Sequence, residues 1–552
     1  MPVRLPFLLL IAAAAGLGLP RMSLGAQHPL ALTPPMGWND WAHYQCDFTA
    51  NTILANARAL VRTGLAARGY DTVTIDDCWM LKRRDSHGNL QPDPARFPRG
   101  MRQVAAAIHA LGLRFGIYED AGSATCGGFA GSGGSGALGT PHFLDDARLF
   151  AAWGVDYLKL DGCNIHPDRG GAGNAAYREA YRAESRALER VGRPIVFSES
   201  APAYFQGTPQ WYDVLAWVRH YGELWREGSD IATYDRQRPG RARFGSVLWN
   251  YDYNLQLGRF QKPGNWNDAD FIIAGDEGMT LAESRSQLAL WSMMSAPLIL
   301  SSDLEHLAPA ALGILGNRAV LSVDQDPLGV MATLVRRSAS MDVLMKPLEG
   351  GDYALAVLNR SPAPLRIRLA AGELGFTATC RLETHELWSG ARQRSVDALG
   401  CEIGAHDTDV WQIRPAAGCG APARIGAITR TVPDVPASRR DAEDYTRCLA
   451  APGILEPCAG TPEELWRIMP DGSLRSGRQC LTGLGRHAAL ANCRAAASQR
   501  WRYTLLGNLI NRASRLCLSG GASGSLTLRA CGHNLAAQIW TLPNGMSARG
   551  RL

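Results

Sequence analysis

Short apolar runs alternate with longer stretches of helical spacing between about residues 35 and 326. The stretches 99–111 and 142–153 are rich in Ala and Leu and have the length and period of helices. Seven apolar runs, most of them closed by acidic or polar residues, predict strands: 72–77, 114–119, 157–161, 195–199, 214–219, 271–275 and 298–303. Strands that alternate with helices are expected to lie parallel in one sheet.

The number of these units predicts fold class α/β, with a (β/α)8 TIM barrel over residues 27–326. In such a barrel the carboxyl ends of the strands form the active site, where the polar ends of the runs would lie. A flat, doubly wound sheet is the alternative, but no Gly-rich phosphate loop follows the first predicted strand.

The pattern of hydrophobic and polar positions changes after residue 326. Short alternating segments at 353–358, 365–369 and 408–413 are separated by Gly, Pro and Asn, which predicts a small antiparallel β-sandwich over residues 327–415. Residues 416–440 are rich in Ala, Gly, Pro and Arg without periodicity, which is typical of a linker.

An internal repeat of roughly 35 residues occupies the segment 441–552. Each of its three units begins with Cys-Leu, contains a second cysteine and then reaches a tryptophan. The cysteine pairs are Cys448 with Cys458, Cys480 with Cys493, and Cys517 with Cys531, and the tryptophans are Trp466, Trp501 and Trp540. Three such units resemble a ricin-type β-trefoil, in which each cysteine pair would close one unit and the tryptophans would fill a shared core.

Composition and charge limit the cellular compartment and the binding partners that are expected for the protein. The net charge is +6, but the charges are scattered and form no long run, so a nucleic-acid partner is not expected. Arg4, the apolar stretch 5–19 and the small residues that follow predict a signal peptide over residues 1–26 and a secreted or periplasmic protein, an uncleaved membrane anchor being the alternative. The 13 cysteines contain no metal-type CxxC pair, so disulfides with one free thiol are expected.

Carboxylates gather where the predicted strands end. Hydrolysis of a glycosidic bond needs two carboxyl groups, one ionised and one protonated. Aromatic side chains near them suit the apolar faces of sugar rings. No His/Cys metal cluster and no Gly-x-Ser-x-Gly elbow competes, so the residues alone suggest a carbohydrate enzyme without metal or cofactor. The acidic residues are Asp76, Asp77, Glu119, Asp120, Asp161, Glu199, Asp230, Asp268 and Asp270.

Several motifs occur in a characteristic order. They are Pro-Met-Gly-Trp-Asn at 35–39, Asp-Asp-Cys-Trp at 76–79, Tyr-Leu-Lys-Leu-Asp at 157–161, Trp-Arg at 225–226 with Asp230, Asn-Trp-Asn-Asp-Ala-Asp at 265–270 and Asp-Gln-Asp-Pro-Leu-Gly at 324–329. Together they resemble the α-galactosidase (melibiase) family, glycoside hydrolase family 27. The resemblance implies a retaining exo-α-galactosidase, monomeric or homodimeric, that acts on oligosaccharide or polysaccharide ends and has no membrane partner once the signal is removed.

The resemblance also implies residue roles. Asp161 would be the nucleophile, with Lys159 on the same face of its strand, and Asp230 would be the acid/base, about 5 to 5.5 Å from Asp161 in a retaining enzyme. Asp76 and Asp77 would bind the 4- and 6-hydroxyls of galactose. Further sugar contacts would be Trp38, Tyr118, Cys126, Ser200, Ala203, Tyr204, Arg226 and Asp270. The implied disulfides are Cys126–Cys163 and Cys46–Cys78; Cys380–Cys401, with Cys419 free, is a further hypothesis.

The chain departs from the family pattern at three places. Ser200 and Ala203 stand where α-galactosidases of animal type carry Glu and Leu, which resembles the α-N-acetylgalactosaminidase branch. The pair Glu119-Asp120 is more acidic than the family pattern. The trefoil units carry Ala450, Thr482 and Ser519 where sugar-binding units have Asp, which puts lectin activity in doubt. A β-L-arabinopyranosidase, an isomaltodextranase and a carbohydrate-binding protein on a dead hydrolase scaffold remain alternatives.

Overall fold

The computed structural model describes residues 30–133, 141–165, 173–431, 446–521, 524–532 and 535–543. The predicted signal peptide, and residues 432–440 of the predicted linker, lie outside these ranges. Within them, no helix is both long enough and apolar enough to cross a membrane.

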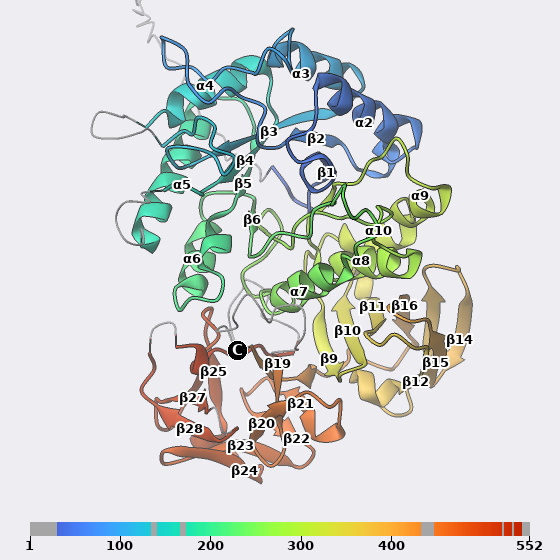
Figure 1. Ribbon diagram of the computed structural model, residues 1–552. Coiled ribbons are helices and arrows are strands. Elements are labelled where there is room, and N and C mark those ends of the chain that lie inside the picture. The colour runs from blue at the N-terminus through green and yellow to red at the C-terminus, as the bar shows by residue number, and fades with distance from the viewer. Residues whose placement is uncertain are drawn as a thin grey trace, which may run out of the picture.

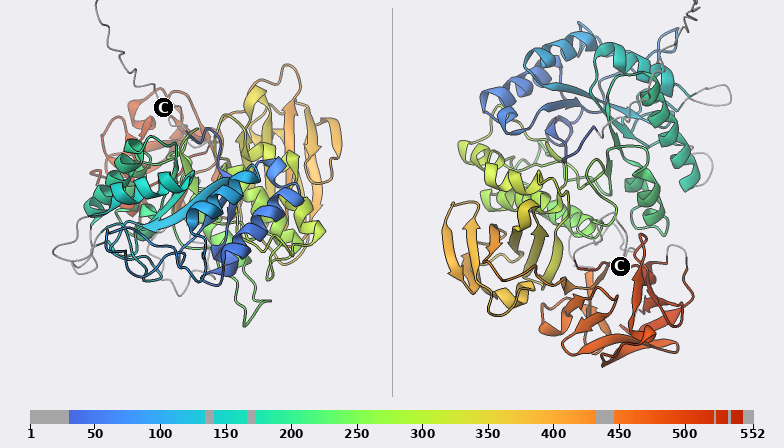
Figure 2. Two further views of the ribbon diagram at one scale, coloured as in Figure 1. Left: turned by 90° about the horizontal axis from the view of Figure 1, so that it is seen from above. Right: turned by 180° about the vertical axis from the view of Figure 1, so that it is seen from behind.

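Eight parallel strands form the first sheet, in the order β8, β1, β2, β3, β4, β5, β6, β7 (Figures 1 and 2). A parallel bridge between Ile272, just after β7, and Leu300 of β8 closes the sheet into the predicted TIM barrel. The strands are β1 (Met36–Asn39), β2 (Thr72–Ile75), β3 (Arg114–Asp120), β4 (Tyr157–Asp161), β5 (Val196–Glu199), β6 (Leu224–Arg226), β7 (Trp266–Asp268) and β8 (Leu298–Leu300).

Helices follow the strands and cover the outside of the barrel (Figure 1). The two stretches predicted as helices are α3 and α4. The helices are α1 (Trp41–Tyr44), α2 (Ala50–Arg62), α3 (Met101–Ala110), α4 (Phe143–Trp153), α5 (Asn174–Arg190), α6 (Trp211–Val218), α7 (Phe244–Asn254), α8 (Leu281–Met294), α9 (Pro309–Leu315) and α10 (Arg318–Asp324).

Two predicted strands are wrong. The run 214–219 belongs mostly to α6, and the strand of that unit is β6, a few residues later. Six of the eight residues of α6 are buried, so its sequence lacks the polar face by which a helix is recognised, and a short apolar run cannot be told from a strand. The run 271–275 contains the bridge to β8 at Ile272, but the strand itself is β7, upstream.

The predicted β-sandwich follows the barrel on the side of α8 (Figure 1). Its larger sheet has the order β14, β13, β16, β11, β10, β9, and β12 pairs with β15, all antiparallel. The strands are β9 (Thr333–Arg337), β10 (Met341–Pro347), β11 (Tyr353–Asn359), β12 (Leu365–Ala370), β13 (Leu382–Glu386), β14 (Arg392–Val396), β15 (Ala398–Ile403) and β16 (Thr408–Pro415).

The C-terminal unit consists of short antiparallel strands around the three repeat tryptophans. Trp466, Trp501 and Trp540 are fully buried in one cluster, and each indole donates to the leucine carbonyl of the Cys-Leu pair of its own unit. The strands are β19 (Thr446–Ala450), β20 (Ile454–Pro457), β21 (Leu465–Ile468), β22 (Leu474–Ser476), β23 (Gln479–Leu484), β24 (His487–Asn492), β25 (Trp501–Tyr503), β26 (Leu509–Asn511), β27 (Cys517–Gly520) and β28 (Leu526–Arg529).

Part of the predicted linker is ordered into this C-terminal unit. β17 (Ile425–Ala427) pairs with β21, and β18 (Thr429–Thr431) pairs with β19. The barrel contacts the unit as well, since Arg259 Nε donates to the Leu505 carbonyl at 2.7 Å. Arg337 of β9 donates to Thr446 Oγ1 at 3.0 Å. The trefoil is therefore docked on both preceding units.

Six disulfides join the cysteines. Five are the expected pairs: Cys46–Cys78, Cys126–Cys163, Cys448–Cys458, Cys480–Cys493 and Cys517–Cys531. The sixth corrects the hypothesis about the sandwich, because Cys380 pairs with Cys419 and Cys401 is free. Cys401 lies on β15, paired to β12, whereas the chain after β16 returns past Cys380, with Ala416 donating to the Arg381 carbonyl.

Two buried carboxyls lie on the outer face of the barrel, on the two strands that flank β4, the strand of Asp161. Glu119 of β3 and Glu199 of β5 both pair in register with Leu160 of β4. Both are fully buried, and within the part of the chain that the structure describes their carboxyl oxygens make no hydrogen bond of regular geometry. A Cβ at Gly222 would lie 2.7 Å from Glu199 Oε1, so this glycine makes room for the Glu199 side chain.

We predict that Glu199→Gln reduces the loss of stability that the wild type shows as the pH rises above the ordinary pKa of a glutamate. Burial, assisted by the charge of Glu223, raises the pKa of Glu199 well above its ordinary value. The folded protein therefore binds this proton more tightly than the unfolded chain. The free energy of unfolding falls as the pH rises above the pKa that Glu199 has in the unfolded chain. It falls by up to about 1.4 kcal/mol per pH unit until the pH reaches the pKa of Glu199 in the folded protein. Gln has no proton to lose.

The measurement is the free energy of unfolding of wild type and variant across acid to alkaline pH. Glu189→Gln, at an exposed position of α5, is the matched control and should follow the wild type. Equal pH slopes for wild type and Glu199→Gln would refute the prediction.

Candidate active site

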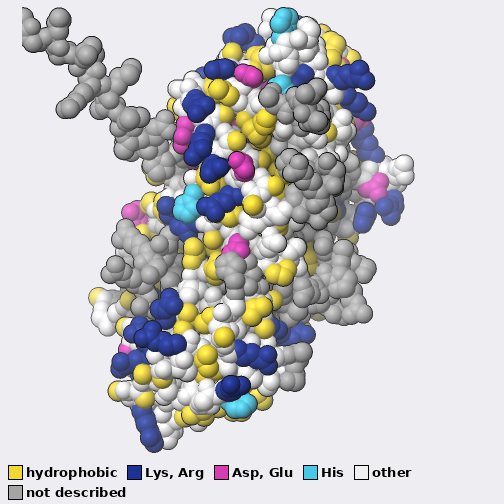
Figure 3. Space-filling model, turned by 90° about the vertical axis from the view of Figure 1, so that its left-hand side faces the viewer, with side chains coloured by type: hydrophobic (Ala, Val, Ile, Leu, Met, Phe, Trp, Pro, Cys, Tyr) yellow, Lys and Arg dark blue, Asp and Glu magenta, His cyan; other side chains and the backbone are white. Residues whose placement is uncertain are grey.

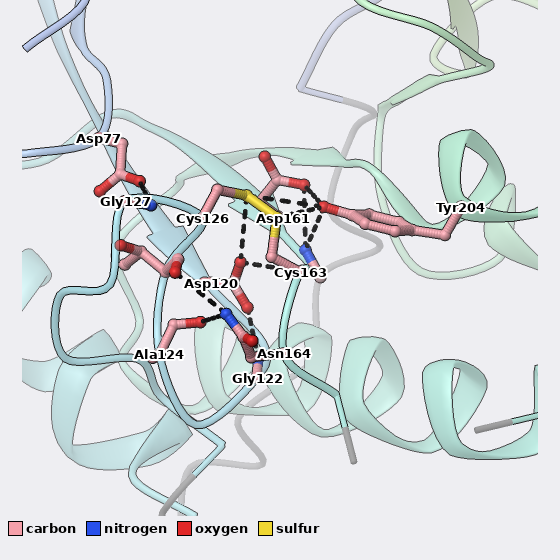
Figure 4. Close-up of a disulfide and its surroundings, with 12 residues drawn as sticks. Asp77, Asp120, Gly122, Ala124, Cys126, Gly127, Asp161, Cys163, Asn164 and Tyr204 are labelled. Atoms are coloured by element: carbon pink, nitrogen blue, oxygen red, sulfur yellow. Dashed lines mark hydrogen bonds between the residues drawn. A yellow bond between two sulfur atoms is a disulfide. The ribbon is translucent and has the colours of Figure 1, made fainter. Parts of the chain in front are cut away.

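Asp161 lies at the end of β4, and two tyrosine hydroxyls reach its carboxylate, of which Figure 4 shows that of Tyr204. Tyr118 of β3 donates to Oδ2 at 3.3 Å, and Tyr204 makes a short hydrogen bond to Oδ1. The backbone N–H of Gly162 donates to the same Oδ1 at 3.0 Å. Strand ends and one loop thus fix both carboxylate oxygens.

The charge of Asp161 is set by opposing effects. Burial raises its pKa, whereas the Lys159 ammonium and the Tyr204 hydrogen bond lower it; the net shift is upward. Asp230 adds to the upward shift, so these two carboxyls lie within electrostatic reach of each other. The Lys159 ammonium also binds Asp76 Oδ2 at 2.7 Å. One cation therefore holds Asp76 and stabilises the charge of Asp161.

Asp76 and Asp77 follow directly after the last residue of β2. Asp76 accepts from Asn39 Nδ2 at 2.7 Å as well as from Lys159, and Asp77 accepts from the backbone N–H of Gly127 at 2.8 Å. Because the strand ends at Ile75, the alternation of faces along a strand no longer separates two adjacent side chains.

Arg226, at the end of β6, joins two further carboxyls of the predicted site. Its guanidinium lies 2.9 Å from Asp230 and 2.9 Å from Asp270. The Asp270 carboxylate also accepts from the N–H of Ile231 at 2.6 Å, which fixes the loop next to Asp230. The Asp230 side chain is 73% exposed, so it stands at the surface of the site.

Desolvation and the charge of Arg226 act in opposite directions on the pKa values of Asp230 and Asp270. The protein atoms around Asp230 partly desolvate its exposed carboxyl and raise its pKa, but the Arg226 and Lys159 charges outweigh this effect and the net shift is downward. Burial raises the pKa of Asp270 to about 6 against the effect of Arg226. Arg226 thus favours the ionised form of both.

The loop after β5 forms another side of the candidate active site. Ser200 is buried and its hydroxyl has no hydrogen-bond partner among the residues described, Ala203 is half-buried, and Tyr204 reaches Asp161. The disulfide Cys126–Cys163 lies against the Tyr204 hydroxyl, with Cys163 Sγ at 3.2 Å (Figure 4). Trp38, buried at β1, donates to the Ser302 carbonyl at 2.9 Å.

Sequence reasoning missed Asn39 and Asp40, which support Asp76. Asp40 Oδ1 accepts from the backbone N–H of Asp76 at 2.7 Å, and Asp40 is fully buried. Burial and the charge of Asp76 raise its pKa well above the ordinary value, which favours a neutral carboxyl. The polar pair after an apolar strand was the signal that could have pointed to them.

On the face shown in Figure 3, Lys and Arg side chains are dispersed between hydrophobic and neutral ones. This agrees with the scattered charge of the sequence.

The site and the barrel define the class of protein. Buried carboxyls, a lysine and tyrosines at the carboxyl ends of the strands are the groups of a glycoside hydrolase. Residues 33–326 match the family model "Alpha galactosidase A", residues 338–413 the "Alpha galactosidase C-terminal beta sandwich domain" and residues 441–540 the "Ricin-type beta-trefoil lectin domain". The chain belongs to the alpha-galactosidase A family.

Relatives of known name agree. The chain is 38% identical over 536 residues to the "Probable alpha-galactosidase A" of Aspergillus clavatus, covering 95% of this chain and 96% of the relative. It is 36% identical over 378 residues to the "Alpha-N-acetylgalactosaminidase" of Gallus gallus, covering 66% and 88%. The α-galactosidase of Saccharomyces cerevisiae solved with raffinose superposes with a TM-score of 0.60 at 25% identity, covering 70% of this chain and 98% of that chain.

We predict that Asp40→Ala destabilises the protein while Asp40→Asn largely preserves it. Alanine leaves the buried N–H of Asp76 without an acceptor, which costs about 1–3 kcal/mol. Asparagine keeps an acceptor oxygen and resembles the neutral carboxyl. Denaturant unfolding of the two variants checks this, and equal losses for both would contradict it.

Proposed function

We propose that this protein is a secreted, retaining exo-α-galactosidase that removes terminal α-linked galactose from oligosaccharides or polysaccharides and needs no cofactor. The observation that carries the proposal is the setting of Asp161, whose two oxygens are fixed by hydrogen bonds and whose charge is stabilised by Lys159 and Tyr204. The family and its α-galactosidase relatives support the choice of sugar. The six disulfides support an oxidising compartment.

In the proposed first step, Asp161 attacks the anomeric carbon while Asp230 gives its proton to the departing glycosidic oxygen. The bond to the leaving group breaks and a covalent galactosyl-enzyme forms. In the second step Asp230, now ionised, takes a proton from water, and the water oxygen displaces Asp161 from the anomeric carbon. Galactose is released with its anomeric configuration retained.

The downward pKa shift of Asp230 has a consequence for this cycle. The first step needs Asp230 protonated, and Arg226 favours the ionised form, so the first step favours acid pH. Asp76 and Asp77 are proposed to accept hydroxyl hydrogen bonds from the sugar, with Lys159 and Asn39 keeping Asp76 oriented.

We predict that the wild-type protein hydrolyses p-nitrophenyl α-galactoside and that Asp161→Asn removes this turnover, by roughly a thousandfold or more, since an amide is no nucleophile. The measurement is a panel of p-nitrophenyl α-galactoside, α-glucoside and β-L-arabinopyranoside with both proteins. Asp145→Asn, exposed on α4, is a control that should keep wild-type rates. Near-normal turnover by Asp161→Asn would remove Asp161 from its role, and turnover of no substrate would leave a carbohydrate-binding protein.

A second candidate function is α-N-acetylgalactosaminidase, which shares the mechanism. The observation that favours it is the small size of Ser200 and Ala203 in the loop after β5, whose Tyr204 reaches Asp161. Small side chains in this loop suit an acetamido substituent at the 2-position of the sugar. The Gallus gallus relative supports this candidate.

We predict that Ser200→Glu combined with Ala203→Leu lowers hydrolysis of p-nitrophenyl α-N-acetylgalactosaminide relative to the α-galactoside, by on the order of tenfold or more, because the larger side chains fill the space for the acetamido group. The ratio of kcat/KM for the two substrates is measured before and after the change. An unchanged ratio would mean that this loop does not set the choice of sugar.

A further inference from the structure

Asp120 is a buried carboxyl beside Asp161 that the proposed mechanism does not use. It ends β3 and pairs in register with Asp161 at the end of β4, so both side chains lie on the inner face of the barrel. Asp120 is fully buried, and one of its oxygens lies within 4.8 Å of an oxygen of Asp161.

The Asp120 carboxyl ties two chain segments together (Figure 4). Oδ2 accepts from the backbone N–H of Cys163 at 2.9 Å, and Oδ1 accepts from the N–H of Gly122 at 2.6 Å. The first contact fixes the turn that follows Asp161. The second fixes the loop that follows β3, and the disulfide Cys126–Cys163 joins the same two segments.

Two carboxyls this close in a buried site share their protons unequally, because both cannot be ionised without a large cost. Lys159 and the Tyr204 hydroxyl stabilise the charge on Asp161. The bonds to Asp120 come from neutral backbone N–H groups, and burial together with the Asp161 charge raises the pKa of Asp120 to about 8. The other titratable groups that act on Asp120 from the surrounding elements are Asp77, Glu119, Tyr118, Tyr177, Tyr181 and Tyr204.

We propose that Asp120 is a positioning residue for Asp161: as a neutral carboxyl it fixes the turn after the nucleophile and leaves the negative charge on Asp161. The inference rests on the proposed function, since it assigns Asp120 to the nucleophile of that reaction. Asp120 transfers no proton to substrate. Its own ionisation would place a second negative charge beside Asp161, and the repulsion would displace the Asp161 carboxylate from its position.

The test measures covalent labelling of Asp161 rather than turnover, so that Asp230 has little influence. A 5-fluoro-α-galactosyl fluoride transfers its sugar to the nucleophile, and fluoride leaves with little help from an acid. The labelling rate is followed by intact-protein mass from acid to alkaline pH, and peptide mapping locates the label. The proteins are wild type, Asp120→Asn, Asp120→Ala and Glu119→Gln.

Glu119→Gln is the matched control, because Glu119 is the adjacent buried carboxyl but faces away from the site. It should be labelled like the wild type, whose rate falls as the pH rises through about 8. Asp120→Asn should lose this alkaline fall, since the amide cannot ionise. Asp120→Ala should be labelled on the order of tenfold to a hundredfold more slowly at every pH, as for a displaced reacting group.

Thermal unfolding reports whether each variant is folded, and Asp120→Asn decides the matter if Asp120→Ala is not. The inference is overturned if Asp120→Asn keeps the wild-type alkaline fall, or if folded Asp120→Ala is labelled as fast as the control. A different outcome separates the two proposals: wild type labelled elsewhere than Asp161, or not at all, removes the proposed function and this inference with it.

Discussion

The buried Lys159 ammonium is the charge on which the mouth of the barrel depends. It binds Asp76, lies over the rings of Tyr118 and Phe271 at 5.1 Å each, and lowers the pKa of Asp161. Burial lowers its own pKa, but Asp76 and Asp161 raise it more, so the lysine stays charged. It also acts on carboxyls carried by other strands, namely Asp40, Asp230 and Asp268. One cation therefore lets several acidic groups share a small buried volume.

The two faces of the same strands treat acidic residues differently. On the inner face, Asp76 and Asp161 have Lys159, and Asp230 and Asp270 have Arg226. On the outer face, Glu119 and Glu199 form no ion pair or regular hydrogen bond with another described residue, and burial raises their pKa values well above the ordinary range. A buried carboxyl without a cation is stable in its protonated form. A cation in direct contact, rather than the side of the strand alone, thus favours the ionised form of a carboxyl in this barrel.

Much of this arrangement could be predicted from the sequence, because strands that end in polar residues form a simple pattern. The barrel, the sandwich strands, the tryptophan core of the trefoil and five disulfides follow from periodicity, repeats and the family resemblance. The prediction of a strand at 214–219 was wrong because most of the residues of α6 are buried and apolar, so that its sequence shows no clear polar face. Cys380–Cys419 could not be deduced, since it depends on how the chain turns back after β16. Asp40 and the partners of Asp120 depend on contacts between neighbouring strand ends, which no spacing along one strand encodes.

The lack of space at Gly222 limits which residues this position can carry. The Glu199 side chain occupies the volume that any larger residue at position 222 would need, and the Phe197 carbonyl lies equally close, at 2.7 Å from a Cβ built there. Because the Phe197 carbonyl belongs to the backbone of β5, a smaller residue at position 199 would relieve only part of the clash of a side chain at 222. Gly222 is therefore constrained by the strand itself as well as by the buried carboxyl, and this turn has no room for a side chain even where Glu199 is replaced.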